Sequence, residues 1–238
     1  MHYLGGKARL AKHIVPFLAE KLQPEGRFIE PFVGGFNIVS ELRKLAPGFP
    51  GRHIYCGDAH YGLIVLYRAL RNGTFTPPDT LSPEEYTALK ARKDWSDPLT
   101  TFAAFGCSFM GMAFASYARG SQGTNYCLRA KNGLLKKREA MADVNFYWGR
   151  YEAAHPHDGD VVYADPPYRD TAEYAGTPQL DYENFYVWCE VAARAGAAVF
   201  VSEFTIPQRR GWIPVWSTTR KALKSTQEKV DYLIAVRP

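Results

Sequence analysis

Apolar positions along the chain change period repeatedly, which predicts alternating strands and helices. Short continuous apolar runs are typical of buried strands, and they occupy residues 27–29, 52–57, 144–148, 160–164, 197–202, 212–216 and 231–236. Helical spacing connects most of them, over residues 10–22, 38–42, 63–70 and 185–192. The pattern predicts an α/β fold: a Rossmann-like, mostly parallel sheet with a C-terminal antiparallel strand. We expect the last two strands to pair antiparallel.

The middle of the chain departs from this alternation. Asn72-Gly73 and Pro77-Pro78 interrupt the pattern, and Ser82-Pro83-Glu84-Glu85 is a helix start with a capping box. A second short helix is expected over residues 99–105. We therefore predict an inserted, mainly helical domain at residues 74–139. Residues 1–73 and 140–238 would form the larger α/β domain around it.

Composition narrows the class of protein. The chain has 238 residues, with 46% hydrophobic and 22% charged, which excludes fibrous and disordered classes. No apolar stretch reaches the length of a membrane span, and the start lacks the apolar core of a signal peptide, so we expect a cytoplasmic protein without a membrane partner. The four cysteines are scattered, which indicates neither a disulfide framework nor a zinc site, and no metal is expected.

The net charge of +5 is mild, but the positive charge is concentrated. Across residues 102–150 the only acids are Glu139 and Asp143. Aromatic residues alternate there with basic ones, and the run Lys136-Lys137-Arg138 is expected to lie on a helix. Such a segment can meet the phosphates and grooves of DNA. A solvated basic face explains the charge equally well.

A glycine-rich turn follows the first predicted strand, at Glu30-Pro31-Phe32-Val33-Gly34-Gly35. A strand, such a turn and a helix in sequence can hold a nucleotide-like ligand at the sheet edge, but the dinucleotide fingerprint is absent. Phe36 stands where a second glycine is expected, and we expect Gly35 to take over the permissive conformation. Asp58, after the second strand, is suited to ribose hydroxyls, or else to capping the following helix.

Two further motifs carry candidate chemistry. Asp165-Pro166-Pro167-Tyr168 follows a predicted buried strand, so it should hold a carboxylate and a ring rigidly beside the ligand crevice. A surface turn with a packing tyrosine is the alternative. Tyr3-Leu4-Gly5-Gly6-Lys7 precedes the first helix, where its glycines let the backbone approach a ligand and its lysine offers a cation. A plain turn with a solvated lysine explains this motif equally well.

Together these motifs resemble those of the Dam-like DNA adenine-N6 methyltransferases of the alpha group, many of which are carried by bacteriophages. The N-terminal motif is similar to the family's cofactor motif, the glycine turn to its methionine-binding motif, and the tetrapeptide to its catalytic motif. Lys229-Val230-Asp231-Tyr232-Leu233-Ile234 is similar to its last sheet motif. Their order, with a variable basic segment in between, is the order of the family.

The resemblance implies S-adenosylmethionine as methyl donor, S-adenosylhomocysteine as product, and a base flipped out of duplex DNA as acceptor. Asp165 and the Pro166 carbonyl would orient the adenine amino group, Pro167 would fix the geometry, and Tyr168 would stack on the base. Cofactor contacts are implied for Tyr3, Gly5, Gly6, Lys7, Glu30, Pro31, Phe32, Gly34, Gly35, Asp58 and Asp165. The resemblance also implies that residues 74–139 are the DNA target-recognition domain and that residues 1–73 and 140–238 are the catalytic domain. DNA contacts are carried over to Tyr117, Arg119, Asn125 and Arg129.

Three other functions stay open at this point. An N4-cytosine methyltransferase would share the fold, although that group more typically has Ser where Asp165 stands. An RNA base methyltransferase lacks support from the inserted basic segment, and a silent DNA-binding protein would not need Asp165, Tyr168 and Asp58. We expect double-stranded DNA as the partner, no obligate protein partner, and a monomer or weak dimer.

Overall fold

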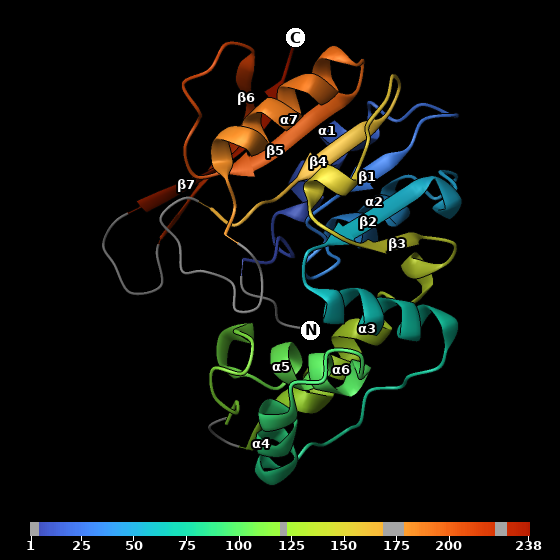
Figure 1. Cartoon of the computed structure of the whole chain (residues 1–238), viewed down its shortest axis with the longest axis vertical. Helices are drawn as coiled ribbons and strands as arrows, with labels where there is room; N and C mark the ends of the chain where they lie inside the picture. Colours follow the sequence, from blue (N-terminus) through green and yellow to red (C-terminus); the bar gives the residue numbers. More distant parts are fainter. Residues whose placement is uncertain (1–4, 120–122, 169–178, 222–227) are drawn as a thin grey trace.

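The computed structural model describes residues 5–119, 123–168, 179–221 and 228–238. Its centre is a seven-stranded sheet with the order β3-β2-β1-β4-β5-β7-β6 (Figure 1). Strands β1 to β5 are parallel, and β7 pairs antiparallel with both β5 and β6. The mixed, mostly parallel sheet with an antiparallel C-terminal strand confirms the predicted fold class. The strands are β1 (Phe28–Glu30), β2 (Ile54–Asp58), β3 (Asn145–Trp148), β4 (Val161–Ala164), β5 (Ala198–Glu203), β6 (Trp212–Lys221) and β7 (Glu228–Val236).

Helices cover both faces of this sheet. On β1, Phe28 packs into a core shared with the helices α1 to α3, whereas its neighbour Ile29 packs on the opposite face with α7. Because both faces are buried, the strands appear in the sequence as continuous apolar runs rather than alternating ones. Figure 1 shows α7 in front of the sheet and α1 and α2 behind it. These helices are α1 (Ala11–Ala19), α2 (Ile38–Leu45), α3 (Tyr61–Asn72) and α7 (Tyr182–Arg194).

The described residues of the segment 74–139 form three α-helices at the lower end of the molecule in Figure 1; one of them, α5, packs against α3, and the other two pack against α5. Ser82 Oγ accepts a hydrogen bond from the Glu85 amide at 3.1 Å and the Glu85 carboxylate accepts one from the Ser82 amide at 2.7 Å, as the predicted capping box requires. Phe102 of this segment and Leu63 of α3 belong to the same buried cluster, so the core continues from the sheet into these helices. They are α4 (Pro83–Arg92), α5 (Pro98–Gly106) and α6 (Tyr126–Leu135).

Several element boundaries differ from the prediction. Helix α6 ends at Leu135, so the run Lys136-Lys137-Arg138 lies in the turns that follow it rather than on a helix. Strand β2 begins at Ile54, because a short 3₁₀ turn occupies the preceding residues. Within the described ranges, none of the helices has both the length and the apolar character that crossing a membrane requires. The 3₁₀ turns are η1 (Gly51–His53), η2 (Phe109–Gly111), η4 (Glu139–Met141) and η5 (Tyr151–Ala153).

Candidate active site

The strand order reverses between β1 and β4. From β1 the chain builds β2 and β3 outward on one side, and it then returns to place β4 on the other side of β1. Ligands of open α/β sheets bind outside the carboxyl ends of the strands at such a reversal. Glu30 and Asp58 are the last residues of β1 and β2, and Asp165 follows β4 directly. The fold therefore brings these three predicted site residues to one edge.

Asp165 is held by a lysine from the other end of the chain. Lys7 Nζ donates to both carboxylate oxygens of Asp165, at 2.6 and 2.9 Å. The same ammonium lies 4.6 Å from the ring centroid of Tyr168, in a cation–π contact. The Lys7 side chain is 6% exposed and that of Asp165 is 17% exposed, so water screens this pair weakly. Lys7 thus joins the carboxylate and the ring of the tetrapeptide.

The rest of the tetrapeptide is packed tightly. Pro166 is buried. The Pro167 carbonyl accepts a hydrogen bond at 2.6 Å from the hydroxyl of Tyr182, which is the first residue of α7. Tyr168 is 9% exposed, and its ring meets the ring of Phe204 edge to face at 4.2 Å. Two consecutive prolines make the turn rigid, and the Asp165 side chain in it is 17% exposed.

The glycine turn after β1 takes a conformation that the sequence did not predict. Gly34 has a φ of 43° and Phe36 a φ of 52°, whereas Gly35 is not in the left-handed region. The expectation that Gly35 takes over the permissive conformation is therefore wrong, because Phe36 adopts it. The Phe36 side chain is fully buried and packs against the rings of Tyr67 and Phe146, at 5.6 and 5.7 Å. Aromatic burial thus offsets a backbone cost of about 1–3 kcal/mol.

Asp58 holds this turn from the neighbouring strand. Its carboxylate accepts hydrogen bonds from the Gly34 amide at 3.0 Å and from the His60 amide at 2.8 Å. Asp58 does not cap the next helix, because the N-cap of α3 is His60 and no side-chain cap is formed there. Burial raises the pKa of Asp58 to about 6, against the opposing effect of the two amide donors. A buried carboxylate thus lies beside the turn, as a ribose ligand should.

Three residues of the site were missed in the sequence. The Tyr67 hydroxyl, on α3, donates to the Gly34 carbonyl. Lys137, from beyond α6, reaches the Gly35 carbonyl at 2.7 Å and Asn37 Oδ1 at 2.6 Å. A β-carbon on Gly57 would lie 2.2 Å from the Tyr147 ring, so only glycine lets that ring cover the end of β2. No local pattern announces these contacts, which depend on tertiary packing.

Glu30 is the most deeply placed acid of the edge, at 2% exposure. Burial, followed by the nearby charges of Asp165 and Asp58, raises its pKa well above the ordinary value, while Lys137 opposes the shift. Burial in turn lowers the pKa of Lys137 to about 8. In the described part of the chain, Oε2 of Glu30 has no hydrogen-bond partner. A buried polar atom without a partner is typical of a site that a ligand completes.

The other predicted cofactor residues vary in position. Gly5 and Gly6 are exposed next to Lys7, and Gly5 has a φ of 75°. Pro31 is buried, and the half-buried Phe32 points toward the α7 side, with its ring 5.6 Å from that of Phe185. Tyr3 lies outside the described residues. The turn and Lys7 therefore approach the edge from two directions, while Phe32 belongs to the core.

The predicted DNA contacts fall into two kinds. Arg119 and Arg129 are exposed, and the Arg129 guanidinium lies over the Tyr126 ring at 5.7 Å. Asn125 instead caps α6, because its Oδ1 accepts from the Leu128 amide at 2.9 Å. The Tyr117 hydroxyl donates to the Leu81 carbonyl at 2.6 Å. Two cations are thus available to a partner, whereas Asn125 and Tyr117 have structural tasks.

Residues 3–97 match the family model described as D12 class N6 adenine-specific DNA methyltransferase, which supports a methyltransferase enzyme and the predicted kinship with the Dam-like adenine methyltransferases. The match contains Lys7, the glycine turn and Asp58, and it ends before Asp165 and before α5. The glycine turn and Asp58 therefore lie inside the family's own region, whereas the assignment of the tetrapeptide rests on its geometry.

Among solved structures, the methyltransferase candidate yhhF from Escherichia coli is similar, with 11% identity and a TM-score of 0.41 over 96% of this chain and 85% of that one. The methyltransferase candidate SMU.472 complexed with SAH is similar at 10% identity and a TM-score of 0.35, over 98% of this chain and 55% of that one. Neither similarity is close enough to bear on the activity. No curated protein matches the sequence.

Proposed function

We propose that the protein is a site-specific DNA methyltransferase that transfers a methyl group from S-adenosylmethionine to N6 of an adenine flipped out of duplex DNA. The observation that carries the proposal is the position of Asp165. This partly accessible carboxylate directly follows β4 at the carboxyl edge of the sheet and is paired with Lys7. The family match over residues 3–97 supports DNA adenine as the substrate class.

The residues at the sheet edge fit S-adenosylmethionine. Asp58 has a carboxylate suited to ribose hydroxyls, and Oε2 of Glu30 is a buried acceptor that a ligand ammonium would complete. Burial raises the pKa of Glu30 well above its ordinary value, and a ligand ammonium placed beside this carboxyl would favour its ionised form. When bound, S-adenosylmethionine supplies an electrophilic methyl group.

The tetrapeptide residues then have separable tasks. A lone pair delocalised into the ring makes the adenine amino group a poor nucleophile, and two acceptors aimed at its N–H bonds redirect that lone pair. Asp165 and the Pro166 carbonyl are these acceptors, and they stabilise the positive charge that develops on nitrogen. Each oxygen of Asp165 can accept a further hydrogen bond while Lys7 holds the carboxylate in place. Tyr168 contacts the base and offsets part of the unstacking cost.

The segment at residues 74–139 is proposed as the DNA-recognition domain. Arg119 and Arg129 are exposed and can neutralise phosphates. Phe109 is 54% exposed on a loop whose base is fixed by a bridge between Ser108 and Tyr117, so an aromatic ring is offered to the same partner. Cations together with an exposed ring are suited to a duplex that must be opened.

The decisive experiment measures methylated bases in unmodified duplex DNA after incubation with the protein and S-adenosylmethionine. Nuclease digestion and mass spectrometry should detect N6-methyladenine with the wild type and none with Asp165→Ala. Asp165→Asn should lose most but not all of the activity, because it keeps one acceptor oxygen for the adenine N–H but removes the charge that stabilises positive charge developing on nitrogen. The matched control Asp143→Asn, at an exposed position, should keep full activity. N4-methylcytosine in place of N6-methyladenine, or full activity in both Asp165 variants, would overturn the proposal.

A further inference from the structure

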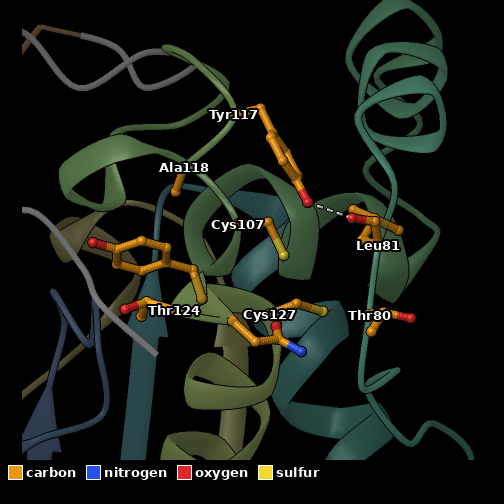
Figure 2. Close-up of a pocket in the computed structure, with 9 residues that line it drawn as sticks. Thr80, Leu81, Cys107, Tyr117, Ala118, Thr124 and Cys127 are labelled. Atoms are coloured by element: carbon orange, nitrogen blue, oxygen red, sulfur yellow. Dashed lines mark hydrogen bonds between the residues drawn. The ribbon is translucent and has the colours of Figure 1, made fainter. Parts of the chain in front are cut away.

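A pocket of about 140 Å³ lies within the inserted segment, away from the carboxyl edge of the sheet (Figure 2). Its wall includes the side chains of Cys107 and Cys127, together with Thr80 and Tyr117. Figure 2 shows the side chains of Cys107 and Cys127 on the same wall of the pocket. It also marks the hydrogen bond that the Tyr117 hydroxyl donates to the Leu81 carbonyl. The volume exceeds the space of a few water molecules, so a small solute fits in the pocket that the two cysteines line.

The two thiols come from helices that pack closely. Cys107 is the C-cap residue directly after α5, and Cys127 is the second residue of α6. A β-carbon on Gly106 would lie 2.9 Å from Cβ of Ala130, so the two helix backbones approach each other next to the thiols. Both thiols line the same pocket, and both are free. Helix packing therefore places two reduced sulfur atoms on one pocket wall.

We propose that Cys107 and Cys127 are a modification site at which hydrogen peroxide forms a reversible disulfide. Cys127 Sγ attacks one peroxide oxygen, the O–O bond breaks, and water leaves as the second oxygen takes up protons. The resulting Cys127 sulfenic acid is attacked by Cys107 Sγ, which forms the S–S bond and releases a second water molecule. The two thiols are oxidised by two electrons, which reduce one peroxide to two water molecules.

The environment assigns the first step to Cys127. The hydrogen bond from Cys107 lowers the pKa of Cys127 against the opposing effect of burial, and the first turn of α6 favours a thiolate. Cys127 Sγ also lies 3.3 Å from the Pro78 carbonyl, which fixes its position. The hydrogen bond with Cys127 and burial raise the pKa of Cys107, which suits a thiol that resolves the sulfenic acid. The remaining cysteines, Cys56 and Cys189, are fully buried in the sheet and in α7.

The experiment treats the reduced full-length protein with a small excess of hydrogen peroxide. Intact mass should fall by the mass of two hydrogen atoms, two of the four thiols should become unreactive, and peptide mapping should find Cys107 linked to Cys127. Dithiothreitol should restore all four. Cys107→Ser should stop at a sulfenic acid on Cys127 that dimedone captures, while Cys127→Ser should react far more slowly. The matched control Cys189→Ala should form the disulfide at the wild-type rate.

Two results would overturn the proposal. One is a mapped wild-type product in which Cys107 and Cys127 are still reduced after Cys56 or Cys189 has been oxidised. The other is a disulfide only between two copies of the chain, seen on a nonreducing gel. Both measurements use the wild type, so they decide the question even where a serine variant fails to fold. Neither depends on methyl transfer, so the outcome is independent of the proposed function.

Discussion

Replacing Asp58 with asparagine tests whether the acid at the end of β2 is the cofactor's ribose ligand. The change keeps the shape of the side chain and one acceptor oxygen, but it removes the charge. Either the Gly34 amide or the His60 amide then faces an amide NH₂ instead of an oxygen. The asparagine side chain can satisfy one of these donors and can no longer accept from both ribose hydroxyls with a charged group.

Two magnitudes decide what the variant should show. Leaving one buried amide unpaired costs about 1–3 kcal/mol. At pH 7, removing the charge relieves a burial penalty on the order of 3 kcal/mol, because the pKa of Asp58 is raised to about 6 from its ordinary value of 3.8. The two effects nearly cancel, so the free energy of unfolding should change little. Loss of charge-assisted bonds to ribose should weaken cofactor binding by about 1.5–3 kcal/mol, or roughly 10- to 150-fold.

The pH dependence provides a second signature. Because the folded-state pKa of Asp58 lies above its ordinary value, ionisation of this group destabilises the fold above about pH 6, and that cost disappears as the pH falls toward 4. Cofactor affinity should follow the opposite course and fall below about pH 6, as the carboxylate becomes protonated. Calorimetric titration with S-adenosylmethionine at pH 5.5, 6.5 and 7.5 would measure this. The Asp58→Asn affinity should be low and flat, whereas Asp143→Asn should follow the wild type. Wild-type affinity in Asp58→Asn at pH 7.5 would refute the ribose assignment.

Three further variants test other parts of the structure. Lys7→Met should lower the free energy of unfolding by about 3–5 kcal/mol in urea, because it leaves Asp165 weakly solvated and unpaired, while Lys7→Arg should restore most of the loss; equal stability of Lys7→Met and the wild type would contradict the pairing. Phe36→Gly should relieve about 1–3 kcal/mol of backbone strain but lose about 3–5 kcal/mol of aromatic packing. The variant should therefore have a lower melting temperature than the wild type. A higher melting temperature would show that the backbone strain outweighs the packing. Arg119→Glu should weaken DNA binding, measured by fluorescence anisotropy, and reduce the dependence of the affinity on salt concentration. The control Arg194→Glu, at the end of α7, should bind like the wild type. The same salt slope for Arg119→Glu and the wild type would place the DNA-binding surface elsewhere.

Much of the candidate site at the carboxyl edge of the sheet could be predicted, because parallel strands place their carboxyl ends together. Val161–Ala164 is buried at every position, so its apolar run identified β4 and the place of Asp165 after it. The same reasoning placed Glu30 and Asp58 at the ends of β1 and β2. These predictions needed only local period and the sheet rule, both of which the sequence contains.

Contacts between distant segments could not be predicted in this way. Lys7 and Asp165 are separated by 158 positions, and nothing local to either residue indicates the pair. Phe36 resembled a misplaced residue because its neighbours on other elements, Tyr67 and Phe146, were unknown. The family resemblance implied a DNA contact for Asn125, but its role as the N-cap of α6 was not predicted, because a cap is identified only once the start of the helix is known. Tertiary packing decided each of these cases.

The reach of Lys137 from beyond α6 to the Gly35 carbonyl has a practical consequence for protein engineering. Exchanging recognition segments between related enzymes is a natural route to a new target sequence. A graft that replaced residues 74–139 as one block would also remove the lysine that donates a hydrogen bond to the glycine turn. Chimaeras that end the exchange at Leu135 should keep this bond and the cofactor affinity of the recipient. The useful junction therefore lies at the end of α6, inside the boundary that the sequence pattern suggests.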